Sequence, residues 1–380
     1  MEDAPRNSAD SCSDSRDRTI GCAILAPTHR RDRNKNSPDL SNPADRKWII
    51  VNPDAIGYFR VLYEDPALIS KLLAQLAEDH TAISPPSRGQ LIDDGFALGF
   101  SGYTQLEQAL EFTKYLDKET EYNVWVAVFS NFRKFLRLFA ATPAYETLRA
   151  YLGARIRTAL KRVGYEQPSE ERGIPILARA HLLGFATILD EEESLKYSAK
   201  LFERWREAPP DSSGIPADLQ NSVYCGAVKS DPTGSAWRHV HEEYLLEQFD
   251  GLRKRSLLNA LSCTTDREFL KQLMEGATAP VTRSTTTGAS DPHPLQFGDD
   301  WYELSPSIVY ANLASSSVAS RAFLVEHLHE KLQGVVTSPL SNGEAAESKD
   351  TNLPPVVSII STLSQYLHSE EEFSKVNWKL

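Results

Sequence analysis

Residues 125–139 read WVAVFSNFRKFLRLF, and this stretch decides the fold class. Its large apolar side chains return every three or four positions, at Trp125, Phe129 and Phe132, which is the spacing of one face of an α-helix. Basic side chains such as Arg133 fill positions between them. Because the chain as a whole is acidic, this interleaving indicates an amphipathic helix rather than a platform for nucleic acid.

The same helical spacing recurs on both sides of this stretch. Upstream, Asp65 and Pro66 give an N-cap followed by proline at the first helical position, before a stripe of Leu68, Leu72 and Leu76. Short breaks rich in proline and glycine separate the helices. Further helices are expected near 216–229, 233–248, 252–262, 266–276, 302–313, 317–333, 354–367 and 369–378.

Many short amphipathic helices joined by tight links favour stacked helix pairs. We therefore expect an all-α fold over 65–380, a right-handed α-α superhelix of the HEAT or armadillo kind. No strict repeat motif is visible, so the repeats would be degenerate. Stretches rich in small and polar residues predict flexible loops within this array near 277–300 and 337–353.

The N-terminal part of the chain differs from the rest. Residues 1–46 are polar and mixed in charge, which predicts a disordered tail. Two β-type runs follow, Trp48–Val51 and Gly57–Tyr63, with an Asn-Pro-Asp turn signal between them. They predict a β-hairpin over 47–64. A lone hairpin is marginal in water, so this one would need a surface to pack on.

Composition disfavours several classes of partner. The formal net charge of −11 argues against a nucleic-acid groove or an anionic membrane surface. No apolar run approaches the ~18 residues that indicate a membrane span. No apolar core of a secretory signal stands near the N-terminus, and N-x-Ser/Thr sequons are absent. Together these features favour a cytoplasmic compartment.

The four cysteines are Cys12, Cys22, Cys225 and Cys263, and they share no C-x-x-C spacing. The pattern therefore suggests neither a disulfide framework nor a cysteine zinc site. Cys225 and Cys263 lie within apolar helical stretches, and we expect both to be small core residues.

Two His-x-His pairs are the candidates for a metal site, His239 with His241 and His327 with His329. Both lie in helical pattern, where residues two apart point to nearly opposite sides. A zinc-binding helix instead places two histidines four residues apart, with a glutamate between them. We therefore expect partly exposed helix histidines, no metal ligand, no catalytic residue and no cofactor held by this chain.

Glycine and acidic clusters are also interpreted as structural. Gly95, Gly99 and Gly102 follow helical pattern with no Lys-Ser/Thr after them, which favours close helix packing and a C-cap over a phosphate loop. The acidic clusters are expected to be helix caps or solvated faces rather than catalytic pairs. They are Asp93–Asp94, Asp190–Glu193 and Glu370–Glu372. Nucleophile signatures such as G-x-S-x-G are absent.

Several motifs, in order along the chain, resemble the aminopeptidase N family of zinc metallopeptidases. They are WIIVN and GYFRVLYE within 48–64, RGQLIDDGFAL at 88–98, LDKETEYNVW at 116–125, IPADL and VYCGAV within 215–228, and LLNALSCTT at 257–265. Each is weak alone, but the set in family order is specific. In that family the first motif closes a small β-sandwich just before a C-terminal helical domain.

The resemblance implies that the chain is this helical domain, of the endoplasmic-reticulum-aminopeptidase-like kind. In the family the domain covers the active-site cleft and forms an internal peptide chamber. The family's H-E-x-x-H zinc motif, distal glutamate and G-[AG]-M-E-N motif belong upstream of the hairpin segment, where this chain has a polar tail. The family's last helices are also expected to be missing. No peptide-contacting residue is assigned by the resemblance.

Three hypotheses follow for the function. The leading one is a peptide-chamber domain that lacks the catalytic zinc domain and is inactive alone. The second is a truncated gene prediction of an active aminopeptidase. The third is an α-solenoid scaffold for a partner protein. Peptides are the expected partners, together with an aminopeptidase catalytic domain or a second copy of the chain. Exposure of the face that meets a catalytic domain predicts self-association.

Overall fold

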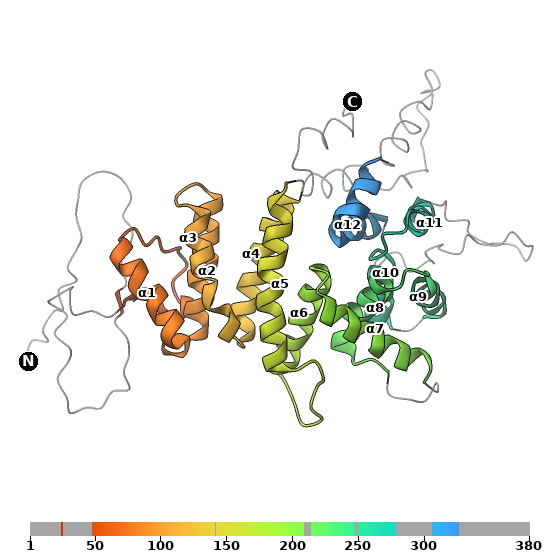
Figure 1. Ribbon diagram of the computed structural model, residues 1–380, viewed down its shortest axis with the longest axis horizontal. Coiled ribbons are helices and arrows are strands. Elements are labelled where there is room, and N and C mark those ends of the chain that lie inside the picture. Colours follow the sequence, from red (N-terminus) through yellow and green to blue (C-terminus); the bar gives the residue numbers. More distant parts are fainter. Residues whose placement is uncertain are drawn as a thin grey trace, which may run out of the picture.

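A computed structural model describes residues 24–25, 48–140, 142–208, 214–247, 250–278 and 306–326 (Figure 1). Helices dominate these ranges, as the all-α prediction requires. They are α1 (Pro66–Asp79), α2 (Pro85–Phe100), α3 (Leu106–Glu111), α4 (Tyr122–Phe139), α5 (Ala144–Val163), α6 (Ile174–Ile188), α7 (Glu192–Arg206), α8 (Ala217–Ser230), α9 (Ser235–Leu246), α10 (Gly251–Leu261), α11 (Arg267–Thr278) and α12 (Pro306–Ser316). Short 3-10 helices lie at Pro53–Ala55, His80–Ala82 and Lys114–Lys118. Residues 318–326 are also helical.

From α2 onward the helices pack in two rows. The even-numbered helices lie side by side in chain order, α2 against α4, α4 against α6, α6 against α8, α8 against α10 and α10 against α12. Each odd-numbered helix from α5 onward packs mainly on the even-numbered helix that follows it, α5 on α6, α7 on α8, α9 on α10 and α11 on α12 (Figure 1). We call these the even row and the odd row. The expected superhelical array of stacked helix pairs is therefore confirmed.

Aromatic side chains fill the core at the N-terminal half of the array. Trp125 of α4 is fully buried, and the ring of Phe96 on α2 meets Phe132 edge-on with centroids 5.0 Å apart. On the other side of α4, Phe129 lies 4.5 Å from Phe185 of α6. The stripe quoted from 125–139 thus holds three neighbouring even helices together, because its side chains point to α2 and α6 alike.

The predicted β-hairpin over 47–64 is not formed. The strand β2 (Ile50–Val51) pairs antiparallel with β1 (Ile24–Leu25), a segment that lies within the predicted tail. Residues 57–63 take bends and irregular backbone instead of a strand. The hairpin prediction was wrong because β-propensity indicates only that a segment is extended. It does not indicate which other segment forms hydrogen bonds with it.

Side chains of α2 take the place of the missing partner strand. The carboxylate of Asp94 accepts the backbone N–H of Val61 at 2.9 Å and the guanidinium of Arg60 at 2.9 Å. Asp94 is only 5% exposed. The interpretation of Asp93–Asp94 as a cap or a solvated face is therefore wrong for Asp94, which anchors the preceding segment to the first even helix.

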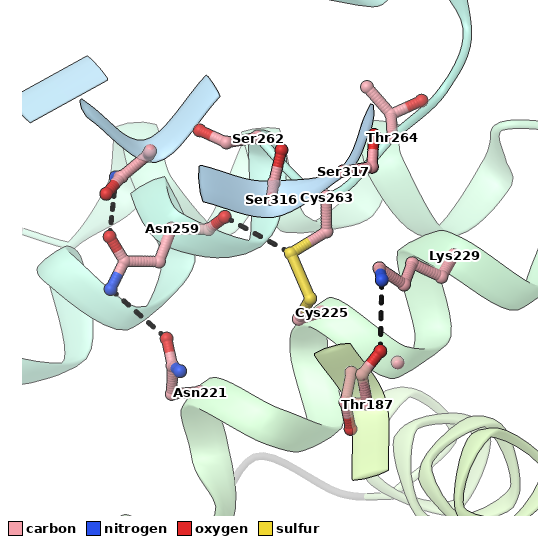
Figure 2. The surroundings of a disulfide bond; sticks show 12 residues. Thr187, Asn221, Cys225, Lys229, Asn259, Ser262, Cys263, Thr264, Ser316 and Ser317 are labelled. Atoms are coloured by element: carbon pink, nitrogen blue, oxygen red, sulfur yellow. Dashed lines mark hydrogen bonds between the residues drawn. A yellow bond between two sulfur atoms is a disulfide. The ribbon is translucent and has the colours of Figure 1, made fainter. Parts of the chain in front are cut away.

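Cys225 of α8 and Cys263, which follows α10, form a disulfide with Cα atoms 5.4 Å apart (Figure 2). Cys263 lies in the core and Cys225 packs against it, as predicted, but the expectation that the cysteines form no disulfide was wrong. The two cysteines stand 38 residues apart in the sequence. They meet because α8 and α10 are neighbours in the even row, and spacing along the chain carries no sign of that.

Some of the other sequence predictions concern described residues, and others lie outside them. The helix expected at 302–313 is found as α12, and the start of the one expected at 317–333 is present. The loop at 337–353 lies outside the described residues, as do almost all of 1–46 and 277–300 and the helices expected beyond 353. No helix in the described ranges combines the length and apolar character that crossing a membrane requires. The boundary at residue 65 stays a prediction.

Candidate functional site

The two histidines of the His-x-His pair on α9 pack against different aromatic rings. The ring of His239 packs against Trp205 at 5.2 Å between centroids, and the ring of His241 packs against Trp237 at 5.2 Å. Both histidines are partly exposed on different sides of α9, which confirms their interpretation. The second pair, in 327–329, lies outside the described residues. Within the described ranges no group of three or more His, Cys, Asp or Glu side chains is arranged so that it could hold a metal ion.

The glycine cluster serves helix packing, as predicted. Gly95 and Gly99 lie against α3, where a Cβ added to Gly99 would come within 2.8 Å of a methyl group of Leu106. Gly102 has a φ of 77°, in the left-handed region, two residues beyond the end of α2. These positions explain the glycines without any phosphate ligand.

The acidic cluster Asp190–Glu193 lies at the start of α7, as predicted. The carboxylate of Glu191 accepts the backbone N–H of Ser194 at 2.8 Å and the guanidinium of Arg157 at 2.6 Å. Burial is the largest influence on Glu191 and would raise its pKa, but these hydrogen bonds outweigh it and hold the pKa below its usual range. The cluster at Glu370–Glu372 lies outside the described residues.

A pocket of about 80 Å³ lies where distant parts of the chain meet. It is lined by the C-terminal half of α4, the start of α5, the end of α6, the end of α12 and the residues that follow α12. Its polar side chains are Arg133, Arg137, Tyr145, Ser315, Ser316, Ser317 and Arg321. We call it the arginine pocket.

The charged side chains that line the arginine pocket are all arginines. Arg133 and Arg137 lie one helical turn apart on α4, Arg321 is 5% exposed, and no acidic residue is among the lining residues. The hydroxyl of Ser317 accepts the N–H of Ser320 at 2.9 Å and so caps the helical residues 318–326 at the pocket. A helix N-terminus carries positive partial charge. Guanidinium groups, hydroxyls and such a terminus are typical of a site for a carboxylate or a phosphate.

Asp190 acts electrostatically on the pocket residue Tyr145 and is itself paired with basic residues outside the pocket lining. Asp190 lies 2.7 Å from Lys229 and 3.6 Å from Arg149. Burial, followed by the charge of Asp190, raises the pKa of Tyr145, while Arg149 and Arg321 oppose that rise. The Tyr145 hydroxyl therefore keeps its proton at neutral pH and remains a hydrogen-bond donor beside the arginines.

Sequence reasoning missed this site. Arg133 and Arg137 were interpreted only as the polar face of an amphipathic helix. In the helix expected at 317–333, only His327 and His329 were candidate site residues, and Arg321 was not. The pocket forms because residues almost two hundred positions apart meet in the folded array, as Arg133 and Arg321 do. The pair of arginines at helical spacing was the one local signal available.

Comparisons with known proteins place the chain in a family. The sequence model of the ERAP1-like C-terminal domain matches residues 48–289. The chain is 27% identical to mouse (Mus musculus) glutamyl aminopeptidase over 236 residues, which cover 62% of the chain and 24% of the relative. It is 31% identical to cheetah (Acinonyx jubatus) aminopeptidase Q over 256 residues, covering 64% and 25%.

A third relative, the membrane alanyl aminopeptidase of Manduca sexta, is 28% identical over 234 residues, covering 60% of the chain and 23% of the relative. The chain thus spans about a quarter of the length of these curated relatives. The matched region holds α1 to α11 and the motifs quoted above. The chain therefore belongs to the ERAP1-like C-terminal domain family, the helical C-terminal part of aminopeptidases of the aminopeptidase N type.

Proposed function

We propose that this chain binds peptides through their carboxyl end, as the peptide-holding part of an aminopeptidase-type protein, and does not cleave them by itself. The arginine pocket carries the proposal. It gathers three guanidinium groups and four hydroxyls in a space of about 80 Å³, which suits one carboxylate and little more. The relatives that cover the chain are aminopeptidases by name, so a peptide is the ligand that supplies this carboxylate.

Zinc chemistry has no place in the proposal for the chain alone. The printed sequence contains no H-E-x-x-H motif, and the histidines of α9 point to different aromatic neighbours. Removal of N-terminal residues from peptides, with zinc as the cofactor, would need a catalytic domain that provides the zinc ligands. The chamber-domain hypothesis therefore stays the leading one, and the truncated-prediction hypothesis is compatible with the same site.

The scaffold hypothesis fits the site less well. A folded partner protein binds through a broad surface, commonly about 800 Å² on each side. The arginine pocket is small and charged, and it accommodates the end of a chain rather than a face. A scaffold role would need a further surface, for which the pocket offers no support.

The compartment is part of the proposal. The disulfide between Cys225 and Cys263 supports folding in an oxidising compartment, because structural disulfides are rare where glutathione and thioredoxin keep thiols reduced. This inference differs from the cytoplasmic compartment that was predicted from the sequence. Peptide mapping of the protein from its native cells without reductant tests it, and free thiols at both positions would contradict it.

The test of peptide binding compares two forms of one peptide. We expect a fluorescent octapeptide with a free carboxyl terminus to bind roughly tenfold more tightly than its C-terminal amide, because hydrogen bonds to charged groups contribute about 1.5–3 kcal/mol. Fluorescence anisotropy gives both dissociation constants. Arg137→Gln should remove most of the difference, since it deletes one guanidinium from the pocket.

The matched control is Arg162→Gln, an exposed arginine on α5 that does not line the pocket. It should leave the ratio between acid and amide unchanged. Equal affinity of the acid and the amide for the wild-type chain would refute carboxylate binding. Release of amino acids from the peptide by the purified chain would refute the absence of cleavage.

A further inference from the structure

Three asparagines on successive helices of the even row form a hydrogen-bonded series. The side-chain amide N–H of Asn312 on α12 donates to the side-chain oxygen Oδ1 of Asn259 on α10 at 2.6 Å. The side-chain amide N–H of Asn259 in turn donates to the side-chain oxygen Oδ1 of Asn221 on α8 at 3.2 Å. Figure 2 shows Asn221 and Asn259 beside the disulfide that joins the same two helices. We call the three residues the asparagine ladder.

On α8 the ladder residue lies away from the contact with α7. On α8 the residue that packs against Ser198 of α7 is Gly226, five positions and therefore about 140° around the helix from Asn221. Asn221 is exposed, and Asn259 and Asn312 are partly exposed. A bound chain can therefore reach these amides without moving a helix.

Packing alone does not call for asparagine at these positions. Asparagine is a poorer helix former than alanine or leucine, and a partly exposed amide–amide hydrogen bond contributes only about 0.5–1.5 kcal/mol. Each side-chain amide offers two donors and two acceptor positions. Within the ladder, Asn221 uses one acceptor position and Asn312 uses one donor. Asn259 uses one donor and one acceptor position.

An asparagine side chain presents an N–H and a C=O side by side, as a peptide group does. It can therefore pair with the main chain of an extended peptide whatever its side chains are, as occurs when a strand is added to a sheet edge. A series of such amides in line gives repeated main-chain contacts. The expected ligand is thus an extended peptide segment bound without strong sequence preference.

The ladder and the arginine pocket share α12. Asn312 lies one helical turn before Ser315 and Ser316, which line the pocket. At the other end, Cys225 and Cys263 each follow a ladder residue by four positions, so the disulfide holds α8 and α10 together one turn from Asn221 and Asn259. The disulfide therefore fixes the two helix segments that carry Asn221 and Asn259, and α12 carries both Asn312 and three residues of the pocket lining.

We propose that Asn221, Asn259 and Asn312 bind the main chain of an extended peptide whose carboxyl end occupies the arginine pocket. This proposal rests on the carboxylate binding proposed above. Neighbouring helices lie about 8–10 Å apart, and an extended chain advances about 3.3 Å per residue. A path from α12 to α8 therefore covers roughly the last five or six residues of the peptide.

The test uses backbone N-methylation, which removes one main-chain donor and keeps the side chains. A series of octapeptides with free carboxyl ends carries one N-methyl group at each of the last six positions in turn. For the wild-type chain we expect a roughly fivefold to tenfold loss of affinity at two or more positions. In Asn259→Ala the unmethylated peptide should bind weaker by a similar factor, and methylation at the position facing residue 259 should cost nothing further.

Asn123→Ala is the matched control, because Asn123 is an exposed asparagine on α4 that takes no part in the ladder. It should behave as wild type throughout. Circular dichroism checks that Asn259→Ala is folded, and the exposed Asn221→Ala replaces it if it is not. A wild-type chain that prefers the acid to the amide but tolerates N-methylation everywhere would overturn the ladder alone. Loss of the preference for the acid, measured separately, would overturn the carboxylate site.

Discussion

At the residue scale, one buried ion pair fixes the start of the helical array. The guanidinium of Arg88 on α2 donates to the carboxylate of Glu119 at 2.7 Å, and the two side chains are 3% and 0% exposed. The same carboxylate accepts the hydroxyl of Tyr115, whose pKa burial and then Glu119 raise well above its ordinary value. Both charged residues belong to the quoted family motifs, so these motifs mark a structural junction rather than chemistry.

Removing one partner of this pair should be costly. We expect Glu119→Gln to lower the free energy of unfolding by about 3–5 kcal/mol, because it leaves the guanidinium of Arg88 buried without a counter-charge. Urea denaturation measures the loss. The exposed pair of Lys196 and Glu192 provides the control, and Glu192→Gln should leave the urea midpoint unchanged. Equal, small effects of both variants would contradict this account of the junction.

At the element scale, the seam between α8 and α10 combines a covalent bond with the asparagine ladder. We expect the double variant Cys225→Ser and Cys263→Ser to lose about 2–4 kcal/mol of unfolding free energy, since the crosslink restricts the unfolded chain over a 38-residue separation. Dithiothreitol should destabilise the wild type by a similar amount and should not affect the variant. An unchanged urea midpoint in both experiments would show that the disulfide does not form.

Helices could be predicted from the sequence because their spacing is local. The stripe from Trp125 to Phe139 marks α4 without reference to any other segment, and Asp65 with Pro66 marks the start of α1. The hairpin was predicted wrongly and the disulfide was not predicted, because strand pairing and the disulfide both depend on segments that are distant in the sequence. Ile50 pairs with Leu25, and Cys225 meets Cys263 only after the even row has stacked.

At the scale of the whole molecule, the described array leaves apolar side chains uncovered at its N-terminal end. Ile56 is 84% exposed and Tyr58 is 109% exposed, and Phe59 and Leu62 beside them are each 37% exposed. Apolar surface gathered on one segment is typical of an interface. We expect this segment to meet either an aminopeptidase catalytic domain or a second copy of the chain.

Self-association through this segment is therefore expected of the chain alone. Light scattering should give a mass above that of the monomer, and the double variant Ile56→Ser and Tyr58→Ser should shift it to the monomer, because it removes the two most exposed apolar groups. Leu246→Ser, at an exposed leucine on α9, should change nothing. A monodisperse wild-type monomer would contradict the expectation.

The arginine pocket also belongs to this scale, which is why the sequence did not reveal it. Its residues come from α4, α5, α6, α12, Ser317 and the helical residues 318–326, and no local pattern links them. The sequence did indicate the family and the superhelical array on which the pocket depends. What it could not indicate is the curvature that brings Arg321 to Tyr145, because curvature is the sum of many small rotations between helix pairs.

A crystal structure of the chain with a bound octapeptide tests the central claim most directly. The account predicts a peptide carboxylate within hydrogen-bond distance of Arg137 or Arg321, with the preceding main chain extended across α12, α10 and α8. A peptide that binds at saturating concentration with its carboxyl end in solvent, or along another face of the array, would contradict it.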